Sequence, residues 1–309
     1  MKIVIADQIV LDPQIIEKIK EIGELTIYTD VPKDKEEIMK RVQDADIITA
    51  RWTDITEEII DKAPPHLKYI IIPAVGYDWI DVAAAAKKGI HILNCPTYNT
   101  SAVANFTIGA IFAVTRQILR ANKDLQSNNW NPMRYVGMEL ENKKLGLIGH
   151  GHIAQKVGLL AEKLGMLVTY TDSKTTAEEI DKLLAQSDIV SLHVPLTNST
   201  RHLLDERRLR LMKKESYLIN TARGAVIDQK ALIKLLEEGH FAGVALDVFE
   251  GEPFSNTPSE EVVKLAQMDR VLATPHTAFD TKETQERLGA ELLANIKSCV
   301  EGNPINVVN

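Results

Sequence analysis

Short, uniformly apolar runs alternate with longer amphipathic runs along the whole chain. A short run rich in β-branched residues predicts a strand buried on both faces, and an apolar stripe recurring every three or four residues predicts a helix. From residue 1 to about residue 98, the runs of strand type are KIVIA, LTIY, DIITA, KYIII and IHIL. The helical runs between them are DPQIIEKIKEIG, DKEEIMKRVQ, TEEIIDKA and WIDVAAAAKKG. This alternation predicts a doubly wound parallel sheet.

A second series of the same kind follows, with KLGLIG, LVTYTD, DIVSLHV, SYLIN, AGVALDV and RVLATP as strands. Between the two series, TSAVANFTIGAIFAVTRQILRANKDL predicts one long helix with Thr100 or Ser101 as its N-cap. This helix is apolar almost all round, so we expect it to be buried between domains or between subunits. The final stretch, TKETQERLGAELLANIKSCV, predicts one amphipathic helix. The predicted fold class is therefore α/β, with two doubly wound parallel-sheet domains.

Composition and charge narrow the classes of function. The chain has 309 residues, 45% of them hydrophobic, which is enough for two full-sized cores in a soluble globular protein. Its net charge of -7 disfavours a nucleic-acid surface, which needs clustered lysine and arginine. The basic cluster ERRLRLMKK has the pattern of a solvated helix face.

The two cysteines, Cys95 and Cys299, are far apart and outside any CxxC spacing. This argues against a disulfide framework or a metal site and favours a reducing compartment. The N-terminal run MKIVIAD is too short for a signal peptide, and no run approaches the ~20 apolar residues of a membrane span. We therefore expect a cytoplasmic protein with neither nucleic acid nor membrane as a partner.

A glycine motif, GHGHIA at residues 149–154, lies between a predicted strand and a predicted helix. In that context GxGxxA is a dinucleotide-binding fingerprint. Gly149 would make the tight turn, Gly151 would let the backbone approach a pyrophosphate, and the helix N-terminus would offer free N–H groups. Asp172, about twenty residues further on, can bind both ribose hydroxyls and would repel a 2′-phosphate, which favours NAD over NADP. Alternatively Asp172 is an ordinary strand-end or N-cap residue, and Lys174 could partly accommodate the phosphate.

Four more motifs follow in order: HVPLTNST, NTARGAVID, DVFEGEP and TPHTA. Together with the glycine motif they resemble the D-isomer-specific 2-hydroxyacid dehydrogenases over nearly the whole chain. The resemblance implies an NAD-dependent oxidoreductase with a flavodoxin-like substrate domain at residues 1–98 and 283–309 and a Rossmann NAD-binding domain at residues 99–282. It also implies an active site in the cleft between the domains, and a homodimer built through the NAD domain and the long helix.

By the family's pattern, the catalytic residues are Arg223 of TARG, Glu252 of EGEP and His276 of TPHT. His276 would exchange the hydroxyl proton, because imidazole titrates near neutrality. Glu252 would hydrogen-bond the other ring nitrogen, and Arg223 would hold the substrate carboxylate. Each residue has an alternative role: a surface salt bridge for the arginine, a solvated loop position for the glutamate, and a strand cap for the histidine. Glu250, two residues earlier, competes with Glu252 for the catalytic position.

The resemblance also implies binding residues. Backbone N–H groups of Val75 and Gly76 would bind the substrate carboxylate, unless PAVGYDWID is a plain strand-to-helix turn. Asp247 would contact the nicotinamide end, or would be a buried carboxylate satisfied by backbone. His193, Pro195 and Thr200 would line the adenine side of the cofactor. For these three residues a purely structural role is almost as well supported as a contact with the cofactor. The full set of predicted cofactor contacts is Gly149, Gly151, His152, Ile153, Asp172, His193, Pro195, Thr200, Thr221, Ala222, Arg223, Asp247, His276 and Ala278; the predicted substrate contacts are Val75, Gly76, Arg223 and His276.

The chain departs from the family's pattern at three places. His152 stands where the family commonly has an arginine, so we expect NAD binding to weaken as pH rises through the titration of this histidine. The stretch SKTTAEEIDKLLAQ is short, which trims the adenosine end of the predicted pocket. Asn105 replaces a carboxylate, and we assign no consequence to that change.

The substrate is less well determined by the sequence. In TARWTDIT, where phosphoglycerate dehydrogenases tend to display phosphate-binding arginines, only Arg51 is basic. This favours a small acid such as lactate, glyoxylate or hydroxypyruvate. Phosphoglycerate dehydrogenation, phosphite oxidation and a non-enzymatic, NAD(H)-sensing corepressor-like role stay open. Formate oxidation is disfavoured, because that branch has an amide where Glu252 stands.

Overall fold

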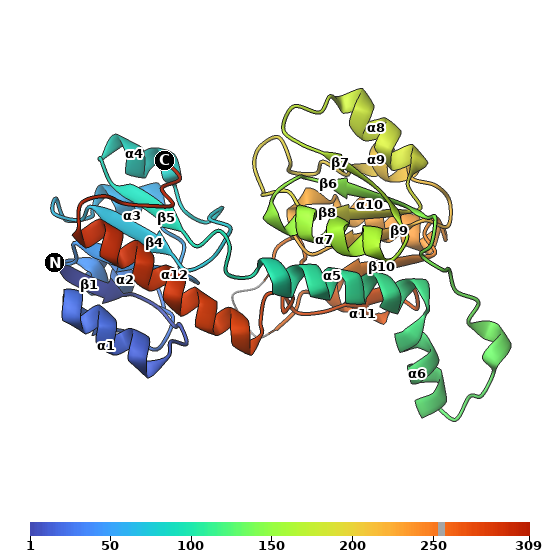
Figure 1. Ribbon diagram of the computed structural model, residues 1–309, viewed down its shortest axis with the longest axis horizontal. Coiled ribbons are helices and arrows are strands. Elements are labelled where there is room, and N and C mark those ends of the chain that lie inside the picture. The colour runs from blue at the N-terminus through green and yellow to red at the C-terminus, as the bar shows by residue number, and fades with distance from the viewer. Residues whose placement is uncertain (253–256) are drawn as a thin grey trace. The chain divides into compact units, whose positions relative to one another are not determined.

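The computed structural model describes residues 1–252 and 257–309 and divides into two compact units (Figure 1). Unit 1 comprises Met1–Asn99 and Asp280–Asn309, and unit 2 comprises Thr100–Phe279. Each unit is built on one parallel sheet with helices on both faces. The predicted fold class is confirmed.

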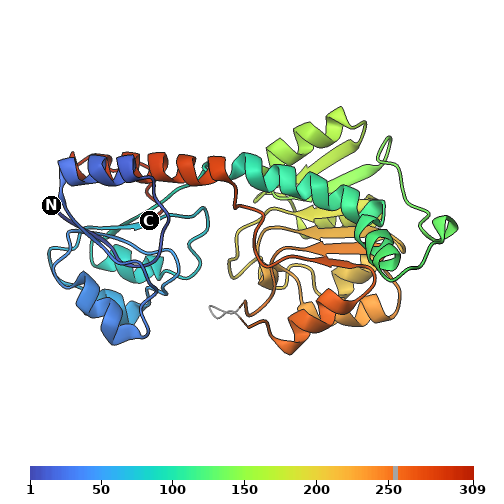
Figure 2. The same ribbon diagram turned by 90° about the horizontal axis from the view of Figure 1, so that it is seen from below.

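The sheet of unit 1 has the strand order β2-β1-β3-β4-β5, which is the flavodoxin-like order. Helices α1 and α12 cover one face, and α2, α3 and α4 cover the other (Figure 2). Successive side chains such as Ile3 and Val4 enter opposite cores, so both positions must be apolar and the strands read as continuous hydrophobic runs. The elements are β1 (Lys2–Ile5), α1 (Pro13–Ile22), β2 (Glu24–Ile27), α2 (Lys35–Val42), β3 (Ile47–Thr49), α3 (Glu57–Asp61), β4 (Tyr69–Ile72), α4 (Val82–Lys87), β5 (His91–Asn94) and α12 (Lys282–Val300).

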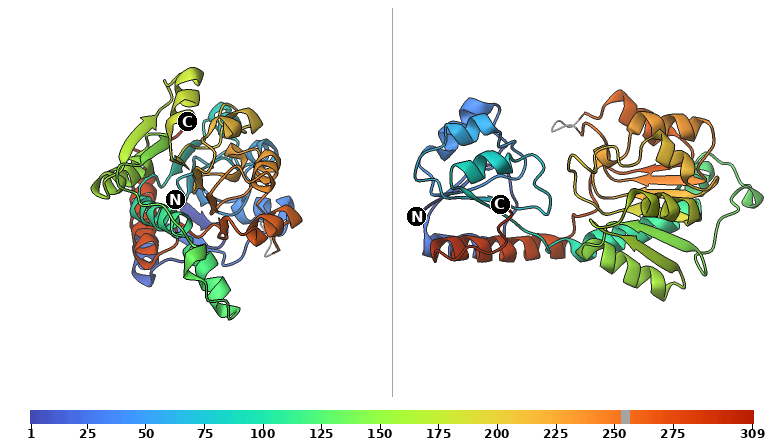
Figure 3. Two further views of the ribbon diagram at one scale, coloured as in Figure 1. Left: turned by 90° about the vertical axis from the view of Figure 1, so that its right-hand side faces the viewer. Right: turned by 90° about the horizontal axis from the view of Figure 1, so that it is seen from above.

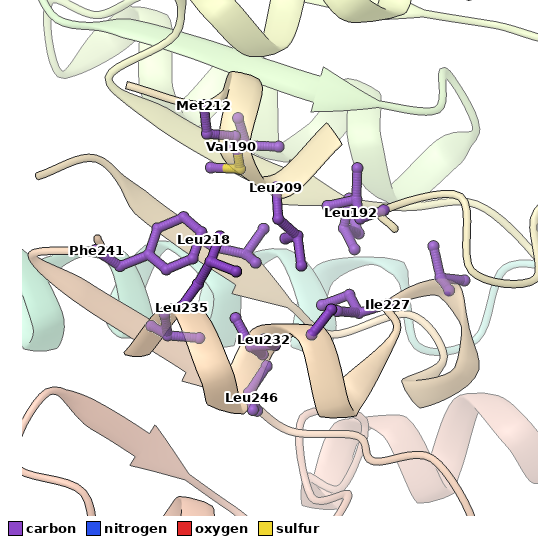
Figure 4. Close-up of a cluster of buried hydrophobic side chains, with 14 of the residues drawn as sticks. Val190, Leu192, Leu209, Met212, Leu218, Ile227, Leu232, Leu235, Phe241 and Leu246 are labelled. Carbon is purple, nitrogen blue, oxygen red and sulfur yellow. The ribbon is translucent and has the colours of Figure 1, made fainter. Parts of the chain in front are cut away.

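The sheet of unit 2 has the order β11-β10-β9-β8-β6-β7. Helices α5 and α7 cover one face, and α8, α9, α10 and α11 cover the other (Figure 3). In the core on this second face, Leu192, Leu209 and Leu232 meet from one strand and two helices (Figure 4). The elements are α5 (Thr100–Thr115), α6 (Ile118–Gln126), η1 (Pro132–Arg134), β6 (Lys144–Ile148), α7 (His152–Lys163), β7 (Leu167–Thr171), α8 (Ala177–Gln186), β8 (Ile189–Leu192), α9 (Glu206–Leu211), β9 (Tyr217–Asn220), η2 (Gly224–Val226), α10 (Gln229–Glu237), β10 (Gly243–Leu246), α11 (Glu260–Gln267) and β11 (Val271–Ala273).

The strand order of unit 2 determines where a ligand can bind. From β6 the chain passes to β7 on one side and then returns to β8 on the other. Connections that leave in opposite directions open a crevice at the carboxyl ends of the strands, and ligands of doubly wound sheets bind there. The glycine motif follows β6, and His193 follows β8.

The prediction of one helix over residues 100–125 was wrong. The chain bends by 60° between α5 and α6, and Gln117 has a φ of 51°. The cause is the segment that returns after α6. Its Met138 N–H donates to the carbonyl oxygen of Thr115 at 2.9 Å, and Gln117 Nε2 donates to the oxygen of Val136 at 2.9 Å. The Thr115 carbonyl that would continue the helix is thus engaged elsewhere, and α5 ends.

The predicted N-cap was also wrong, because Thr100 is itself the first helical residue. Among the described residues, no single helix is long and apolar enough to cross a membrane; only the bent pair of α5 and α6, taken together, reaches the required length and composition. Cys95 and Cys299 are buried free thiols.

The basic cluster predicted as a solvated helix face covers α9 and the three residues that follow it, and it pairs with carboxylates of neighbouring segments. Asp181 on α8 accepts hydrogen bonds from Arg207 Nη1 at 2.6 Å and from Arg208 Nε at 3.0 Å. The bond from Arg207, together with that from Arg208, holds the pKa of Asp181 below its ordinary value. An acid with a depressed pKa adds stability above its unfolded pKa, and this contribution is lost as pH falls.

We expect Asp181→Asn to lower the free energy of unfolding by up to about 1 kcal/mol at neutral pH, because the pair is partly exposed. The difference from the unsubstituted protein should shrink below about pH 4, where the carboxylate protonates. Urea unfolding at several pH values measures both. Asp44→Asn is the control, since Asp44 makes one exposed pair with Lys2 at 3.4 Å. A difference that grows towards acid pH would contradict the prediction.

Candidate functional site

The glycine motif packs tightly at one glycine and is open at the next. Gly149 has a φ of 113°, and a Cβ built on it would lie 2.5 Å from the carbonyl oxygen of His193. Its N–H donates to Thr171 Oγ1 at 3.1 Å. Gly151 is the N-cap of α7, where no side chain of the described residues caps the helix and a Cβ would meet no atom within 4 Å. The first N–H groups of α7 are therefore available to an anion such as a pyrophosphate, and this part of the site fits a dinucleotide. His152 and Ile153 are the first two residues of α7.

Asp172 directly follows β7, as predicted from the spacing. Its Oδ1 accepts hydrogen bonds from Lys174 N–H at 2.8 Å and from Thr175 Oγ1 at 3.1 Å. The bond from Lys174 has the larger effect and that from Thr175 the smaller, and both hold the pKa of the Asp172 carboxyl below its ordinary value. The carboxyl group is therefore ionised at neutral pH. Asp172 thus stands at the end of β7 and accepts bonds within a local turn, which agrees with the strand-end alternative, whereas the N-cap of α8 is Thr176. Its Oδ2 takes part in neither bond. The contact with ribose stays a prediction.

The loop after β8 contains the predicted adenine-side residues. His193 Nε2 lies 2.9 Å from Ser191 Oγ, and desolvation lowers the pKa of His193 to about 3. This imidazole is therefore neutral and cannot supply charge to a phosphate. Thr200 Oγ1 donates to the carbonyl oxygen of Pro195 at 2.6 Å, which closes the loop on itself.

Glu252 pairs with His276. Glu252 Oε2 lies 2.7 Å from His276 Nδ1, and its Oε1 accepts the N–H of Phe249 at 2.7 Å. The side chains of the pair are 32% and 38% exposed, so the imidazole is accessible. Glu250 lies instead 2.8 Å from His202 Nε2. The geometry therefore selects Glu252 over Glu250 as the partner of His276, whereas Pro253 of the same motif lies outside the described residues.

His276 has a φ of 52°, in the left-handed region that a bulky side chain rarely adopts. Its N–H lies 2.8 Å from the carbonyl oxygen of Asp247 and 3.0 Å from that of Thr274. Strained backbone of this kind persists only where surrounding contacts determine it, and it concentrates at functional sites.

Asp247 supplies the contacts that hold this loop. It is 1% exposed; its Oδ1 accepts from Thr274 Oγ1 at 2.6 Å and from Thr277 N–H at 2.9 Å, and its Oδ2 accepts from Ala278 N–H at 2.9 Å. Burial raises its pKa, although these hydrogen bonds act in the opposite direction. Asp247 is thus the buried carboxylate satisfied by backbone that the sequence left as an alternative. Its contact with nicotinamide stays a prediction.

Arg223 lies in the loop after β9. Asn220 fixes this loop, since its Nδ2 donates to the carbonyl oxygen of Arg223 at 2.9 Å and its Oδ1 accepts from Ala222 N–H at 3.0 Å. Thr221 Oγ1 lies 3.0 Å from Thr107 Oγ1 of α5. A Cβ on Gly224 would overlap the carbonyl carbon of Phe249. The backbones of the Arg223 and Glu252 loops are therefore in direct contact, and the loops after β9, β10 and β11 form one assembly.

In unit 1, Val75 and Gly76 follow β4. Asn94 Nδ2 donates to the carbonyl oxygen of Val75 at 2.8 Å, which holds the turn in place. Within the described part of the chain, neither N–H of this pair donates a hydrogen bond. Two adjacent amides of this kind at the end of a parallel strand suit a carboxylate.

Sequence reasoning missed a buried acid that shapes the Arg51 loop. Asp7 is 1% exposed and accepts hydrogen bonds from the N–H groups of Arg51 and Trp52 and from Thr53 Oγ1, at 2.7–3.0 Å. Burial raises its pKa against the effect of these bonds. The Arg51 guanidinium lies 5.1 Å from the centre of the Trp52 ring. An acidic residue directly after the first buried strand was the available signal.

Comparison with known proteins identifies relatives of this chain. A model of the D-isomer specific 2-hydroxyacid dehydrogenase NAD-binding domain matches residues 108–278. The chain is 39% identical to a glyoxylate reductase of Thermofilum pendens, over 94% of this chain and 90% of that one. It is 38% identical, over 100% of its length, to a D-3-phosphoglycerate dehydrogenase of Methanocaldococcus jannaschii, of which it spans 59%. A solved acyclic imino acid reductase in complex with NADPH and D-Arg has a TM-score of 0.91 at 34% identity, with both chains covered completely.

These similarities confirm the predicted enzyme class and cofactor. The matched segment of unit 2 is the NAD-binding domain, and it contains the glycine motif together with Arg223, Glu252 and His276. By sequence and by fold, the chain belongs to the family of NAD-dependent, D-isomer-specific 2-hydroxyacid dehydrogenases.

Proposed function

We propose that the protein transfers a hydride between NAD(H) and C2 of a small D-2-hydroxy or 2-oxo acid. The observation that carries this proposal is the 2.7 Å pair of His276 and Glu252. The pair lies on loops that follow β11 and β10, at the same edge of the sheet as the glycine motif after β6. An acid–base group and a dinucleotide fingerprint on one edge are what a hydride transfer with proton exchange requires.

The residues have distinct roles in this proposal. Bound NAD(H) supplies the hydride donor or acceptor. Because Glu252 engages Nδ1 of His276, Nε2 is left to exchange the proton with the substrate oxygen. Reduction of a 2-oxo acid consumes one proton, which this imidazole supplies to the substrate oxygen. The fork of donors on Arg223 suits the substrate carboxylate, and the adjacent amides of Val75 and Gly76 suit a group of the same kind.

For the substrate, we propose an unphosphorylated acid of the glyoxylate, hydroxypyruvate or lactate type. Arg51 is the only basic residue of TARWTDIT, and its guanidinium lies near the Trp52 ring. The similarity to a glyoxylate reductase agrees with a small substrate. D-3-phosphoglycerate is the second candidate, favoured by the similarity to the Methanocaldococcus jannaschii dehydrogenase.

Oxidation of NADH with a panel of acids tests this proposal. We expect turnover with glyoxylate, hydroxypyruvate or pyruvate, at a kcat/KM at least about tenfold above that for phosphohydroxypyruvate, since TARWTDIT contains only one arginine to hold a phosphate. Pyruvate with added ammonium tests reduction of an imine, because a structural neighbour is an imino acid reductase. NADPH in place of NADH tests whether Asp172 selects against a cofactor with a 2′-phosphate. A preference for phosphohydroxypyruvate would support the second candidate. Tight NADH binding without any turnover would support the sensor role instead.

His152 provides a prediction for cofactor binding. It is the first residue of α7 and is exposed, beside the amides proposed to bind the pyrophosphate. We expect NAD affinity to fall about two- to fivefold as the imidazole loses its charge, the size of an exposed charge effect at a helix N-terminus. Calorimetric titration of NAD between mildly acidic and mildly basic pH measures this.

The neighbouring histidine is the matched control for this experiment. His150 is exposed in the same motif, and its ring lies 4.6 Å from that of Tyr170. His152→Gln should make the affinity independent of pH, whereas His150→Gln should retain the dependence. The idea fails if NAD affinity in the unsubstituted protein does not change with pH.

We also propose a homodimer formed through α6 and the segment that follows it. Figure 1 shows α6 and this segment extending away from the rest of unit 2. Trp130, Met133 and Val136 are each more than 80% exposed, and Ile118 and Leu125 more than half exposed. Large apolar side chains concentrated in this way mark a surface that another protein covers. Sedimentation should show a dimer that Trp130→Ser with Met133→Ser weakens by at least about tenfold in Kd, and a monomeric unsubstituted protein would contradict the assignment.

A further inference from the structure

A second histidine–glutamate pair lies beside the proposed catalytic pair. Glu250 and Glu252 flank Gly251, whose φ of 69° turns the backbone sharply between them. Glu252 points to His276, and Glu250 Oε1 lies 2.8 Å from His202 Nε2. Two residues of one short turn therefore make separate contacts with two histidines. The proposed function uses only one of these contacts.

His202 contacts both loops that carry proposed catalytic residues. Its imidazole lies against Glu250, in the Glu252 loop, and its N–H donates to the carbonyl oxygen of Ala225 at 2.8 Å, in the turn after Arg223. The φ of His202 is 50°, again in the left-handed region. A residue held in that conformation, with main chain and side chain bound to different loops, connects the two loops mechanically.

Other polar and charged side chains around the pair also contact Glu250. Arg201 Nη1 lies 4.0 Å from Glu250 Oε1, the oxygen that His202 also contacts. The main-chain N–H of Glu250 donates to Gln229 Oε1 at 3.1 Å, and Gln229 Nε2 donates to Glu261 at 3.0 Å. Glu250 thus has contacts with three residues, Arg201, His202 and Gln229, and His202 provides the short contact to its carboxylate.

We propose that His202 is a positioning residue for the proposed acid–base reaction: by holding Glu250, it fixes the turn at Gly251 and with it the direction of Glu252 towards His276. This inference rests on the proposed function. When the imidazole of His202 is removed, Glu252 retains its bond from Phe249 but loses the support of the turn. Contact of Glu252 with His276 then weakens, and the protonated imidazole of His276 is less favoured.

The test needs a variant that removes the imidazole without straining the backbone. His202→Gly does this, because glycine adopts a φ of 50° without cost from a Cβ. Glu250→Gln is the conservative variant, since an amide oxygen still accepts a hydrogen bond from His202. His240→Gly is the control, because the imidazole of His240 likewise contacts one group, the carbonyl oxygen of Met212 at 3.1 Å, but in the segment before β10.

The first readout is the titration of His276 by NMR in the resting enzyme, with the signal assigned from His276→Ala. We expect the midpoint to move to lower pH in His202→Gly and to stay in place in Glu250→Gln and His240→Gly. This readout needs no turnover, so it separates failure of the positioning role from failure of the proposed function. A midpoint unchanged in His202→Gly would overturn the proposal.

The second readout is a double-mutant cycle on the reduction rate. We expect His202→Gly to lower kcat about three- to tenfold, with NADH affinity within about twofold of the original, because a misaligned supporting residue costs rate rather than binding. In a Glu252→Gln background the same change should have almost no further effect, since His202 acts through Glu252. Equal losses in both backgrounds would show that His202 acts by another route and would overturn the proposal.

Discussion

Replacement of His276 with alanine should lower kcat for reduction of a 2-oxo acid by about two to four orders of magnitude, the usual contribution of a general acid. The affinity for NADH should stay within about threefold, because the proposed pyrophosphate site is at the glycine motif and not at His276. Stopped-flow or steady-state oxidation of NADH measures the rate, and calorimetry measures binding. His66→Ala is the control, since His66 is an exposed histidine of unit 1.

Backbone strain complicates this comparison, and asparagine resolves it. His276 has a φ of 52°, so alanine changes both the chemistry and the conformational cost of the loop. Asparagine tolerates the left-handed region but cannot exchange a proton near neutrality. His276→Asn should therefore retain the loop conformation and lose the same activity as His276→Ala. Retention of more than about a tenth of the original kcat in His276→Asn would exclude His276 as the acid–base group.

Gly224→Ala should have the second-largest effect, although Gly224 has no chemical group to offer. An added Cβ would overlap the carbonyl group of Phe249, and its third neighbour is the backbone nitrogen of Glu250. Backbone atoms cannot swing aside as the end of a flexible side chain can, so the two loops must separate. We expect kcat to fall about a hundredfold from the displacement of Glu252 and Arg223, and the free energy of unfolding to fall by about 1–3 kcal/mol.

Kinetics together with urea unfolding separate this effect from that of His276→Asn, which should retain the loop conformation and leave stability largely unchanged. Gly109→Ala is the matched control. A Cβ there meets no atom within 4 Å, and Gly109 lies inside α5, so alanine should be neutral or slightly stabilising. A Gly224→Ala protein with the original kcat would contradict the contact between the two loops.

The strands could be predicted from sequence because both faces of each sheet are covered. Adjacent residues such as Ile70 and Ile71 enter different cores, so each strand appears as an uninterrupted apolar run. The break after α5 could not be predicted in this way. It depends on Met138 reaching the carbonyl of Thr115, a contact between segments separated by a whole helix. Local patterns contain no information about such a contact.

The candidate site, like the fold, could be predicted from the sequence only in part. Motifs located Arg223, His276 and the glycine loop, because these residues stand at the ends of strands in a fixed order. The choice between Glu250 and Glu252 needed the fold, since both lie in one short turn and only their distances to histidines differ. His202 was missed because its partner is 48 residues away in sequence. Asp247 was located by its motif, but the backbone contacts that occupy it could not be deduced from spacing.

The discontinuity of unit 1 sets an order of events during synthesis on the ribosome. Its sheet is complete once β5 has emerged, yet one face still lacks α12, which supplies Leu292 and Ile296 to the core around Ile3. The 180 residues of Thr100–Phe279 are made in between and form a unit with cores of their own. The unit whose synthesis begins first is therefore completed last, and its apolar face needs protection from aggregation until α12 has left the ribosome.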